Sequence, residues 1–258
     1  MTSVTEPVLD TPPWVRLFRA ANPGPMTLEG TNTWVIPGVS GALVVDPGPH
    51  LEEHLQAVAA AGPVRGVLLT HHHPDHAEGV ERFAELTGAG IVNPSPGETL
   101  SHDGLVITTL LTPGHTRDSV SFRVSGDSDA VFTGDTILGR GSTSVLWPDG
   151  DLGAYLASLE LLAEQGDVPV LPGHGPIRPS CHAAATGYLA HRRQRLSQVT
   201  AARQSGATTP RQIVELVYAD VDRSLWPAAE ATVAAQLEYL TSRDGEHNPG
   251  DDGWGVRE

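Results

Sequence analysis

Short apolar runs, separated by glycine and proline, make up most of the first part of the chain. Apolar runs between turn-forming residues are typical of β-strands, whereas apolar residues spaced three or four positions apart are typical of amphipathic helices. Leu51, Leu55 and Val58 show the helical spacing. The strands expected here are residues 33–36, 42–45, 64–69 and 90–93, and the expected helices are residues 51–61 and 77–86.

Strand patterns cluster in the middle of the chain, and helical patterns fill its last part. Thr209 and Pro210 favour the start of one of these helices, as N-cap and first helical residue. Strands that alternate with helices and then cluster indicate sheets covered by helices, a layered α/β architecture. The expected strands are residues 105–111, 120–124, 130–133 and 168–171, and the expected helices are residues 152–165, 182–203, 232–240 and one that starts at residue 210.

A break in the helical pattern at residues 205–207, which read Ser-Gly-Ala, divides the chain. The segment before the break contains all of the expected strands. The segment after it contains only short helical patterns and ends in a polar, glycine-rich stretch. We therefore expect a main domain at residues 1–204, a small helical region at residues 205–242 and a flexible tail at residues 243–258.

The formal net charge is −15, and all 16 basic residues are arginines. Nucleic-acid-binding proteins usually carry a basic face, because neutralised phosphates supply much of their affinity. The charge therefore weighs against tight, non-specific binding of nucleic acid, although it leaves room for a local groove lined by arginine.

A single cysteine, Cys181, excludes an internal disulfide, and we interpret it as a structural thiol in a helix. No apolar run reaches the roughly 20 residues that a membrane-spanning helix needs, so no membrane partner is expected. The first residues lack a basic segment followed by an apolar core. On that ground we expect a cytoplasmic protein.

The run from Thr70 to His76 reads THHHPDH, and it lies between a short apolar strand and a helical pattern. Residues two positions apart on an extended turn point to the same side. His71 and His73 can therefore bind one metal ion, while Asp75 and His76 face a second. Neutral imidazole and carboxylate are common zinc ligands.

Three later segments each place one potential ligand beside a glycine, at the end of an apolar run. They contribute His115, Asp135 and His174, which brings the set to five histidines and two aspartates. Such a set suits two metal ions with a shared carboxylate. The histidines that fall outside this pattern, and that we interpret as ordinary surface or core residues, are His50, His54, His72, His102, His182, His191 and His247.

The order of these motifs resembles the metallo-β-lactamase superfamily, whose members share an HxHxDH motif and a later His, Asp and His. The resemblance implies a four-layer αββα sandwich for the catalytic domain at residues 1–204. It also implies that Asp46, outside the metal shell, forms a hydrogen bond with a ligand histidine. The implied ligand sets are His71, His73 and His115 for one zinc ion, and Asp75, His76 and His174 for the other, with Asp135 bridging both.

Residues 22–33, 134–139, 172–176 and 188–192 resemble a subgroup near the mitochondrial β-lactamase-like single-strand endoribonuclease. This resemblance implies that residues 205–242 form a winged-helix-like region. Some fungal polyketide thioesterases share the same motifs, so membership of the subgroup does not identify the substrate.

The implied activity is metal-dependent hydrolysis by a hydroxide that bridges two Zn²⁺ ions, with Asp75 and Asp135 as catalytic residues. Iron or manganese is also compatible with histidine and aspartate ligands. Turnover of β-lactams is not expected, because the chain lacks a recognisable secretory signal.

Several substrate classes stay open. One is a small-molecule acyl substrate such as a thioester or lactone, which the low aromatic content favours slightly, and another is single-stranded RNA. Arg192, Arg193 and Arg195 either contact phosphates or form a solvated helix face, and we favour the solvated face. A glyoxalase II-like thioester hydrolase and a non-catalytic metal-binding module are the further alternatives.

Overall fold

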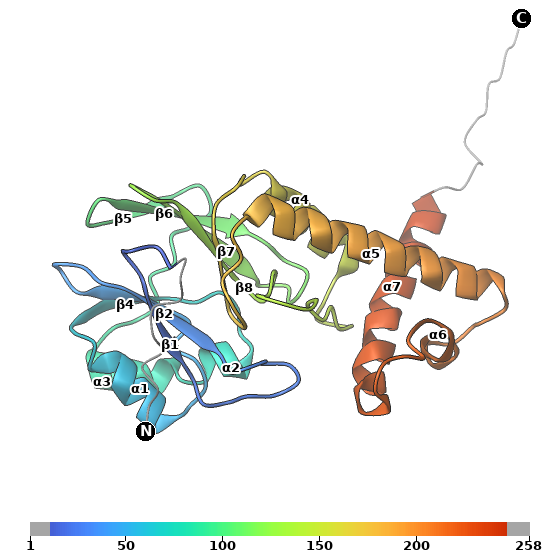
Figure 1. Ribbon diagram of the computed structural model, residues 1–258, viewed down its shortest axis with the longest axis horizontal. Helices are drawn as coiled ribbons and strands as arrows, with labels where there is room; N and C mark the ends of the chain where they lie inside the picture. The colour runs from blue at the N-terminus through green and yellow to red at the C-terminus, as the bar shows by residue number, and fades with distance from the viewer. Residues whose placement is uncertain (1–10, 247–258) are drawn as a thin grey trace, which may run out of the picture.

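The computed structural model describes residues 11–246, with side chains up to residue 243. Two β-sheets lie face to face, and helices cover the outer face of each (Figure 1). The first sheet has the order β1-β2-β3-β4 and the second the order β5-β6-β7-β8-β9. The strands are β1 (Arg16–Arg19), β2 (Asn32–Ile36), β3 (Ala42–Val45), β4 (Val64–Leu68), β5 (Thr99–His102), β6 (Leu105–Leu111), β7 (Val120–Ser125), β8 (Ala130–Gly134) and β9 (Val170–Pro172).

The first four helices of the described residues lie between strands in the sequence, and the others follow the last strand. Figure 1 shows α1 and α3 beside the first sheet, and α4 and the first part of α5 beside the second. The helices are α1 (Glu52–Ala59), α2 (Pro74–Ala77), α3 (Val80–Thr87), α4 (Leu152–Ala163), α5 (Cys181–Gln204), α6 (Pro210–Val217), the short 3₁₀ helix η1 (Arg223–Leu225) and α7 (Trp226–Glu246).

Three apolar layers hold the sandwich together, and strand alternation creates them. Neighbouring residues on β2 point to opposite faces of the first sheet: Trp34 packs between the two sheets, and Val35 packs under α1 and α3. On β8, Phe132 likewise faces the layer between the sheets, while Val131 packs against α4 and α5. The αββα architecture predicted from the sequence is therefore confirmed.

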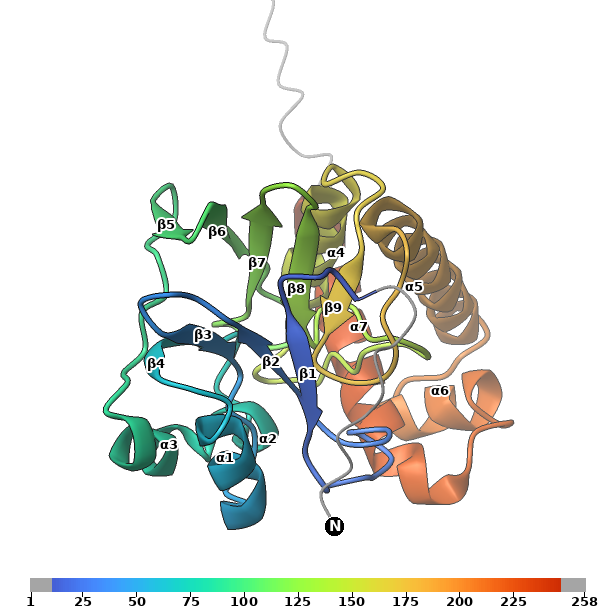
Figure 2. The same ribbon diagram turned by 60° about the vertical axis from the view of Figure 1, so that its left-hand side comes forward.

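The C-terminal helices form a core of their own, separate from the sandwich. Val199 near the end of α5 packs there with Ile213 of α6 and Val233 of α7. The side chain of Thr209 caps α6, and Gln212 completes a capping box, as the Thr-Pro pattern suggested. In Figure 2, α5 runs from the outer face of the second sheet to these helices, so one continuous helix joins both cores.

Three expectations about individual elements were wrong, and two strands were not expected. Residues 90–93 form no strand, because only Ile91 makes an isolated bridge, to Val67. β1 and β5 are short edge strands that the apolar pattern missed. The expected helix at residues 77–86 is two helices, α2 and α3. The helix expected at residues 232–240 extends to Glu246, so residues 243–246 of the expected tail are helical.

The rest of that expected tail, residues 247–258, lies outside the described residues, as does His247. Among the helices of residues 11–246, none combines the length and the apolar character that crossing a membrane requires.

Cys181 is the first residue of α5, and its thiol is buried in the apolar layer beneath α4 and α5. Its Sγ lies 3.3 Å from the carbonyl oxygen of Leu162. Burial raises the pKa of the Cys181 thiol to about 12. The structural role predicted for this cysteine therefore fits its surroundings.

The buried imidazole of His54 predicts a pH dependence of stability. Its Nε2 lies 2.9 Å from Thr33 Oγ1, and burial lowers the pKa of His54 to about 4. The folded chain binds this proton less tightly than the unfolded chain, whose histidine pKa is about 6.5. The contribution of His54 to the free energy of unfolding is therefore fully present above about pH 6.5. It falls by about 3 kcal/mol as the pH falls towards 4.

Denaturant unfolding of the His54→Gln variant at pH 7 and pH 4 measures this contribution. Between pH 7 and pH 4, the free energy of unfolding of the wild-type chain is expected to fall by about 3 kcal/mol more than that of the variant, because glutamine does not titrate. Equal losses in both proteins would contradict the assignment.

Candidate metal centre

The potential ligands come together where strands end, at one edge of the sandwich. His71 and His73 follow β4, His115 follows β6, Asp135 directly follows β8, and His174 follows β9. β3 and β4 run parallel, as do β8 and β9. The carboxyl ends of parallel neighbours lie at the same edge of a sheet, so segments distant in sequence meet there.

All seven predicted ligands lie in two groups. Within each group, the candidate ligand atoms lie within 4.8 Å of one another. The first group is His71, His73 and His115, and the second is Asp75, His76, Asp135 and His174.

The spacing within the first group fits a metal ion. His73 Nδ1 lies 3.2 Å from His71 Nε2 and 3.0 Å from His115 Nε2. Two nitrogens bound to one tetrahedral zinc at about 2.0–2.1 Å lie roughly 3.3 Å apart. Nitrogens at this separation are therefore spaced as metal ligands would be.

In the second group, Asp135 connects the two sets of ligands. Its Oδ1 lies 3.4 Å from His76 Nε2, and its Oδ2 lies 3.4 Å from His174 Nε2. Oδ2 is also 3.8 Å from Nε2 of His115, a member of the first group. Oδ1 is buried and makes no hydrogen bond to any group in the described part of the chain. A buried carboxylate oxygen without a donor is suited to a cation.

Hydrogen bonds turn the lone pairs of four histidines towards the cluster. His115 Nδ1 donates to the carbonyl oxygen of Ser144 at 2.7 Å, and His174 Nδ1 lies 3.3 Å from that of Gly30. His71 Nδ1 lies 3.0 Å from Thr70 Oγ1. A ring that donates through Nδ1 keeps the lone pair of Nε2 free to bind a metal.

Asp46 orients the fourth of these histidines. Its Oδ2 accepts from His76 Nδ1 at 2.8 Å and from Thr70 Oγ1 at 2.7 Å, and its Oδ1 accepts from the Thr70 amide. Asp46 is buried and adopts a left-handed backbone conformation, with φ of 51°. The carboxylate is thus held beside the cluster, where the Asp-Pro-Gly motif predicted it.

Two glycines allow the chain to pass close to the ligands. A Cβ on Gly173 would lie 2.6 Å from both Asp135 Oδ1 and His76 Cε1. Gly134 has φ of +48°, and a Cβ there would lie 2.6 Å from Thr70 Oγ1. A larger residue at either position would displace a candidate ligand or its neighbour.

The charges of the cluster shift the pKa values of its members. Burial raises the pKa of Asp135, but His76 and His174 outweigh burial and hold that pKa well below its usual range. Burial lowers the pKa of His174, but Asp135 and Asp75 outweigh it and raise this pKa to about 9. Burial, together with His76, holds the pKa of His71 well below its usual range.

His72, which we left out of the ligand set, belongs to neither of these groups. It is exposed, and its Nδ1 lies 2.7 Å from Asp118 Oδ1. Its Nε2 lies 3.6 Å from Asp149 Oδ2. His72, His73 and Asp149 also lie close enough to bind a cation, but this third group lies at the exposed rim.

The structure corrects the expectation for one of the helix arginines. Arg192 is buried, so it neither faces solvent nor reaches an external phosphate. Its guanidinium donates to the carbonyl oxygen of Thr143. Ser144 supports the site through its backbone carbonyl, and Thr143 supports it through its hydroxyl, which donates to the carbonyl oxygen of Asp135. No residue pattern in the sequence marks such a role. Arg193 is exposed and pairs with Glu160.

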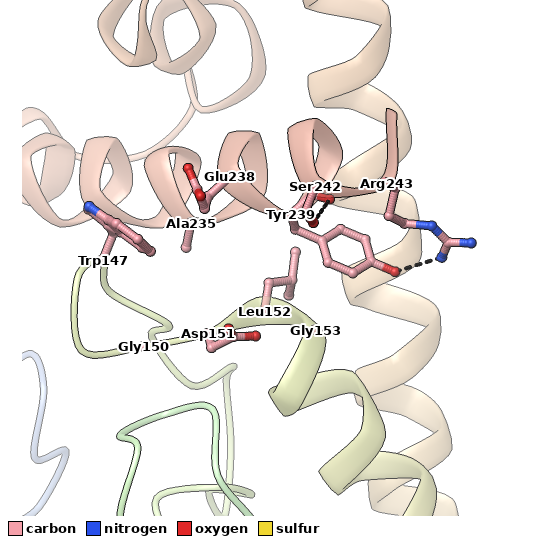
Figure 3. A pocket seen from close by; sticks show the side chains of 10 residues that line it. All are labelled: Trp147, Gly150, Asp151, Leu152, Gly153, Ala235, Glu238, Tyr239, Ser242 and Arg243. Atoms are coloured by element: carbon pink, nitrogen blue, oxygen red, sulfur yellow. Dashed lines mark hydrogen bonds between the residues drawn. The ribbon is translucent and has the colours of Figure 1, made fainter. Parts of the chain in front are cut away.

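A cleft of about 490 Å³ lies between the loop after Ser144 and helix α7 (Figure 3). Trp147 and Tyr239 lie on its two sides, and Tyr239 accepts a hydrogen bond from Arg243. The amide of Asp151, another lining residue, donates to the carbonyl oxygen of Gly114, next to His115. The cleft therefore shares a wall with the metal-site loops.

Comparison with protein families identifies both parts of the chain. Residues 26–109 and 90–174 match the model of the metallo-beta-lactamase superfamily. Residues 209–246 match the beta-lactamase associated winged helix domain. The chain therefore belongs to the metallo-beta-lactamase superfamily. It is a metal-dependent hydrolase with a C-terminal winged-helix domain, as the sequence motifs predicted.

Among curated proteins, the chain is similar to an atrochrysone carboxyl ACP thioesterase of Aspergillus fumigatus. The two are 32% identical over an alignment 228 residues long, which covers 76% of this chain and 71% of that protein. It is also similar to a beta-lactamase-like protein 2 homolog of Caenorhabditis elegans, with 28% identity over 88% of this chain and 84% of that one.

Solved structures show the same fold. A metallo-beta-lactamase family protein of Thermus thermophilus superposes with a TM-score of 0.71 at 22% identity, over 90% of this chain and 94% of that chain. A beta-lactamase domain protein of Burkholderia ambifaria superposes with a TM-score of 0.76 at 21% identity, over 91% of this chain and 88% of that chain.

Metal binding to the metal-free chain is expected to release protons. Because the pKa of His174 is about 9 without metal, this ring is protonated at pH 7 and must lose its proton to become a ligand. Metal affinity should therefore fall as the pH falls below 9. Titration calorimetry in two buffers of different ionisation enthalpy measures the release. A heat of metal binding that does not depend on the buffer would contradict the prediction. The control is His72→Ala, which should release as many protons as the wild type when it binds metal.

Proposed function

We propose that the chain hydrolyses acyl bonds of the thioester type at a site for two zinc ions. The observation that carries the proposal is the position of Asp135 between two complete groups of ligands. His71, His73 and His115 would bind one ion, and Asp75, His76 and His174 the other, with Asp135 shared.

The donor chemistry and spacing of the cluster fit zinc. Imidazole nitrogens and carboxylate oxygens are its usual ligands, and six to seven of them suit two four- or five-coordinate ions. When bound, zinc lowers the pKa of a coordinated water towards about 7 and polarises the carbonyl of the substrate.

The residues of the chain supply orientation and charge for this reaction. Asp75 is half-buried, and its Oδ2 lies 3.0 Å from His174 Nε2, so its carboxylate can accept a proton from the attacking water and orient it. Asp46 holds the ring of His76 and cannot reach the substrate, since it is buried behind that ring. The products would be a carboxylic acid and a thiol.

Two observations favour an acyl substrate over RNA. A relative that shares 32% identity over most of both chains is named an ACP thioesterase. Arg192, one of three arginines that were candidates for phosphate contacts, is buried. The net charge of −15 adds to the same preference.

A substrate panel tests the proposed reaction. The zinc-loaded protein should hydrolyse acyl thioesters of coenzyme A and of N-acetylcysteamine, with release of free thiol measured by a chromogenic disulfide. It should leave single-stranded RNA intact under the same conditions. Cleavage of RNA without turnover of any thioester would overturn the proposal.

Asp135→Asn tests the shared ligand. The amide has nearly the same shape but no negative charge, so kcat for the best thioester should fall by about a thousandfold or more, because metal polarisation contributes several kcal/mol. Asp118→Asn is the matched control, since Asp118 is an exposed carboxylate at the rim of the site. Retention of full activity in Asp135→Asn would refute the role.

A further inference from the structure

Arg192 is a buried cation in the middle of α5. Its exposed fraction is 4%, and among the described side chains no carboxylate pairs with it. Its Nε has no hydrogen-bond partner there, and its guanidinium lies over the ring of Tyr155, 5.2 Å from the centroid. Burial of a charge without a counter-charge costs several kcal/mol. Packing alone therefore does not explain an arginine at this position.

The contacts of the guanidinium lead to the metal centre by two short paths. Arg192 Nη2 donates to the carbonyl oxygen of Thr143. The hydroxyl of the same Thr143 donates to the carbonyl oxygen of Asp135 at 2.6 Å. The next residue, Ser144, accepts from His115 Nδ1 at 2.7 Å through its own carbonyl. Residues 143 and 144 thus contact a ligand of each group.

The segment that contains these two carbonyls has no regular structure. Between β8 and α4, residues 135–151 belong to no helix or strand, so no ladder of hydrogen bonds fixes the positions of Thr143 and Ser144. Tyr155 supports the start of the segment, because its hydroxyl donates to the carbonyl oxygen of Thr136 at 2.7 Å. Arg192 covers the ring of this same tyrosine.

We propose that Arg192 is a positioning residue for the metal centre, which holds the 143–144 backbone so that His115 and Asp135 keep their ligand geometry. The inference rests on the proposed metal site and is independent of the substrate. Guanidinium suits this position because one planar group can donate to a carbonyl and stack on an aromatic ring at the same time.

The position of Arg192 on α5 also connects the two domains. The beginning of this helix packs against the second sheet, and its end packs in the C-terminal core through Val199 and Ala202. A helix anchored at both ends is a rigid support for the guanidinium. The winged-helix domain therefore contributes to the geometry of the metal site without contacting a ligand.

Three variants and one control test the inference. Arg192→Met removes the charge and keeps much of the volume, and Arg192→Lys keeps a cation that can still donate to a carbonyl. Thr143→Val removes the hydroxyl that contacts Asp135 and keeps the shape. Arg193→Met is the matched control, because Arg193 is the neighbouring arginine, exposed and paired with Glu160.

The principal measurement is zinc affinity, determined by competition with a chromogenic chelator. The melting temperature of the metal-free protein and kcat and KM for a thioester are measured in parallel. Arg192→Met and Thr143→Val should each weaken zinc binding by about 10- to 100-fold, the usual effect of losing a group that orients a metal ligand. Arg192→Lys should recover part of the affinity, and Arg193→Met should match the wild type.

A purely structural role gives a different result. If Arg192→Met lowers the melting temperature of the metal-free protein while zinc affinity and kcat stay at wild-type values, the inference is wrong. If that variant does not fold, Thr143→Val and Arg192→Lys decide, and unchanged zinc affinity in both overturns it. A wild type that binds zinc but hydrolyses no thioester would refute the proposed substrate class and leave this inference standing.

Discussion

Imidazole nitrogens held within about 3 Å of one another are the constraint on which the rest of the structure depends. His73 Nδ1 lies 3.0–3.2 Å from two other imidazole nitrogens, and His76 and His174 approach to 3.3 Å. Such an arrangement is repulsive unless a proton or a metal ion lies between the nitrogens. The fold therefore has to hold the rings in place, and it does so with buried carboxylates, backbone carbonyls and glycines that admit close approach.

The sandwich meets this requirement through the ends of its strands. Each sheet places an antiparallel set beside a single parallel pair, β3 with β4 and β8 with β9. The parallel pairs bring Asp46 and the THHHPDH run together on one sheet, and Asp135 and His174 together on the other. The apolar layer that contains Trp34 and Phe132 then holds the two sheets face to face, so that the candidate ligands from both sheets meet.

The sequence allowed prediction where the function depends on a particular type of side chain. The THHHPDH run, with a histidine or aspartate beside glycine at three later strand ends, predicted every member of the two groups that could hold a metal ion. The alternation of strand and helix patterns predicted the layered fold. Edge strands were missed because β1 and β5 carry polar residues on a half-exposed edge. Residues 90–93 look like a strand from their apolar content, but they lie beside β4 with a single bridge. Ser144 contacts His115 through a backbone carbonyl, which every residue possesses, and Thr143 contacts Asp135 through an ordinary hydroxyl. No sequence pattern could therefore reveal the role of these two residues.

The candidate ligands and the cleft beside Trp147 come from different parts of the chain. The ligands come from the strand ends, whereas the cleft beside Trp147 comes from an irregular loop and from α7. Changes in that loop or helix can alter the surroundings of the site while the ligand groups stay intact.

The single thiol of the chain has a practical consequence. Cys181 is buried under α4, and its pKa of about 12 leaves almost no thiolate at neutral pH. The native protein should therefore be inert towards maleimides and other thiol reagents while it stays folded. A cysteine introduced on the surface of α6 or α7 would be the sole labelling site, which makes fluorescence and spin-label distances between the two domains accessible without removal of the native residue.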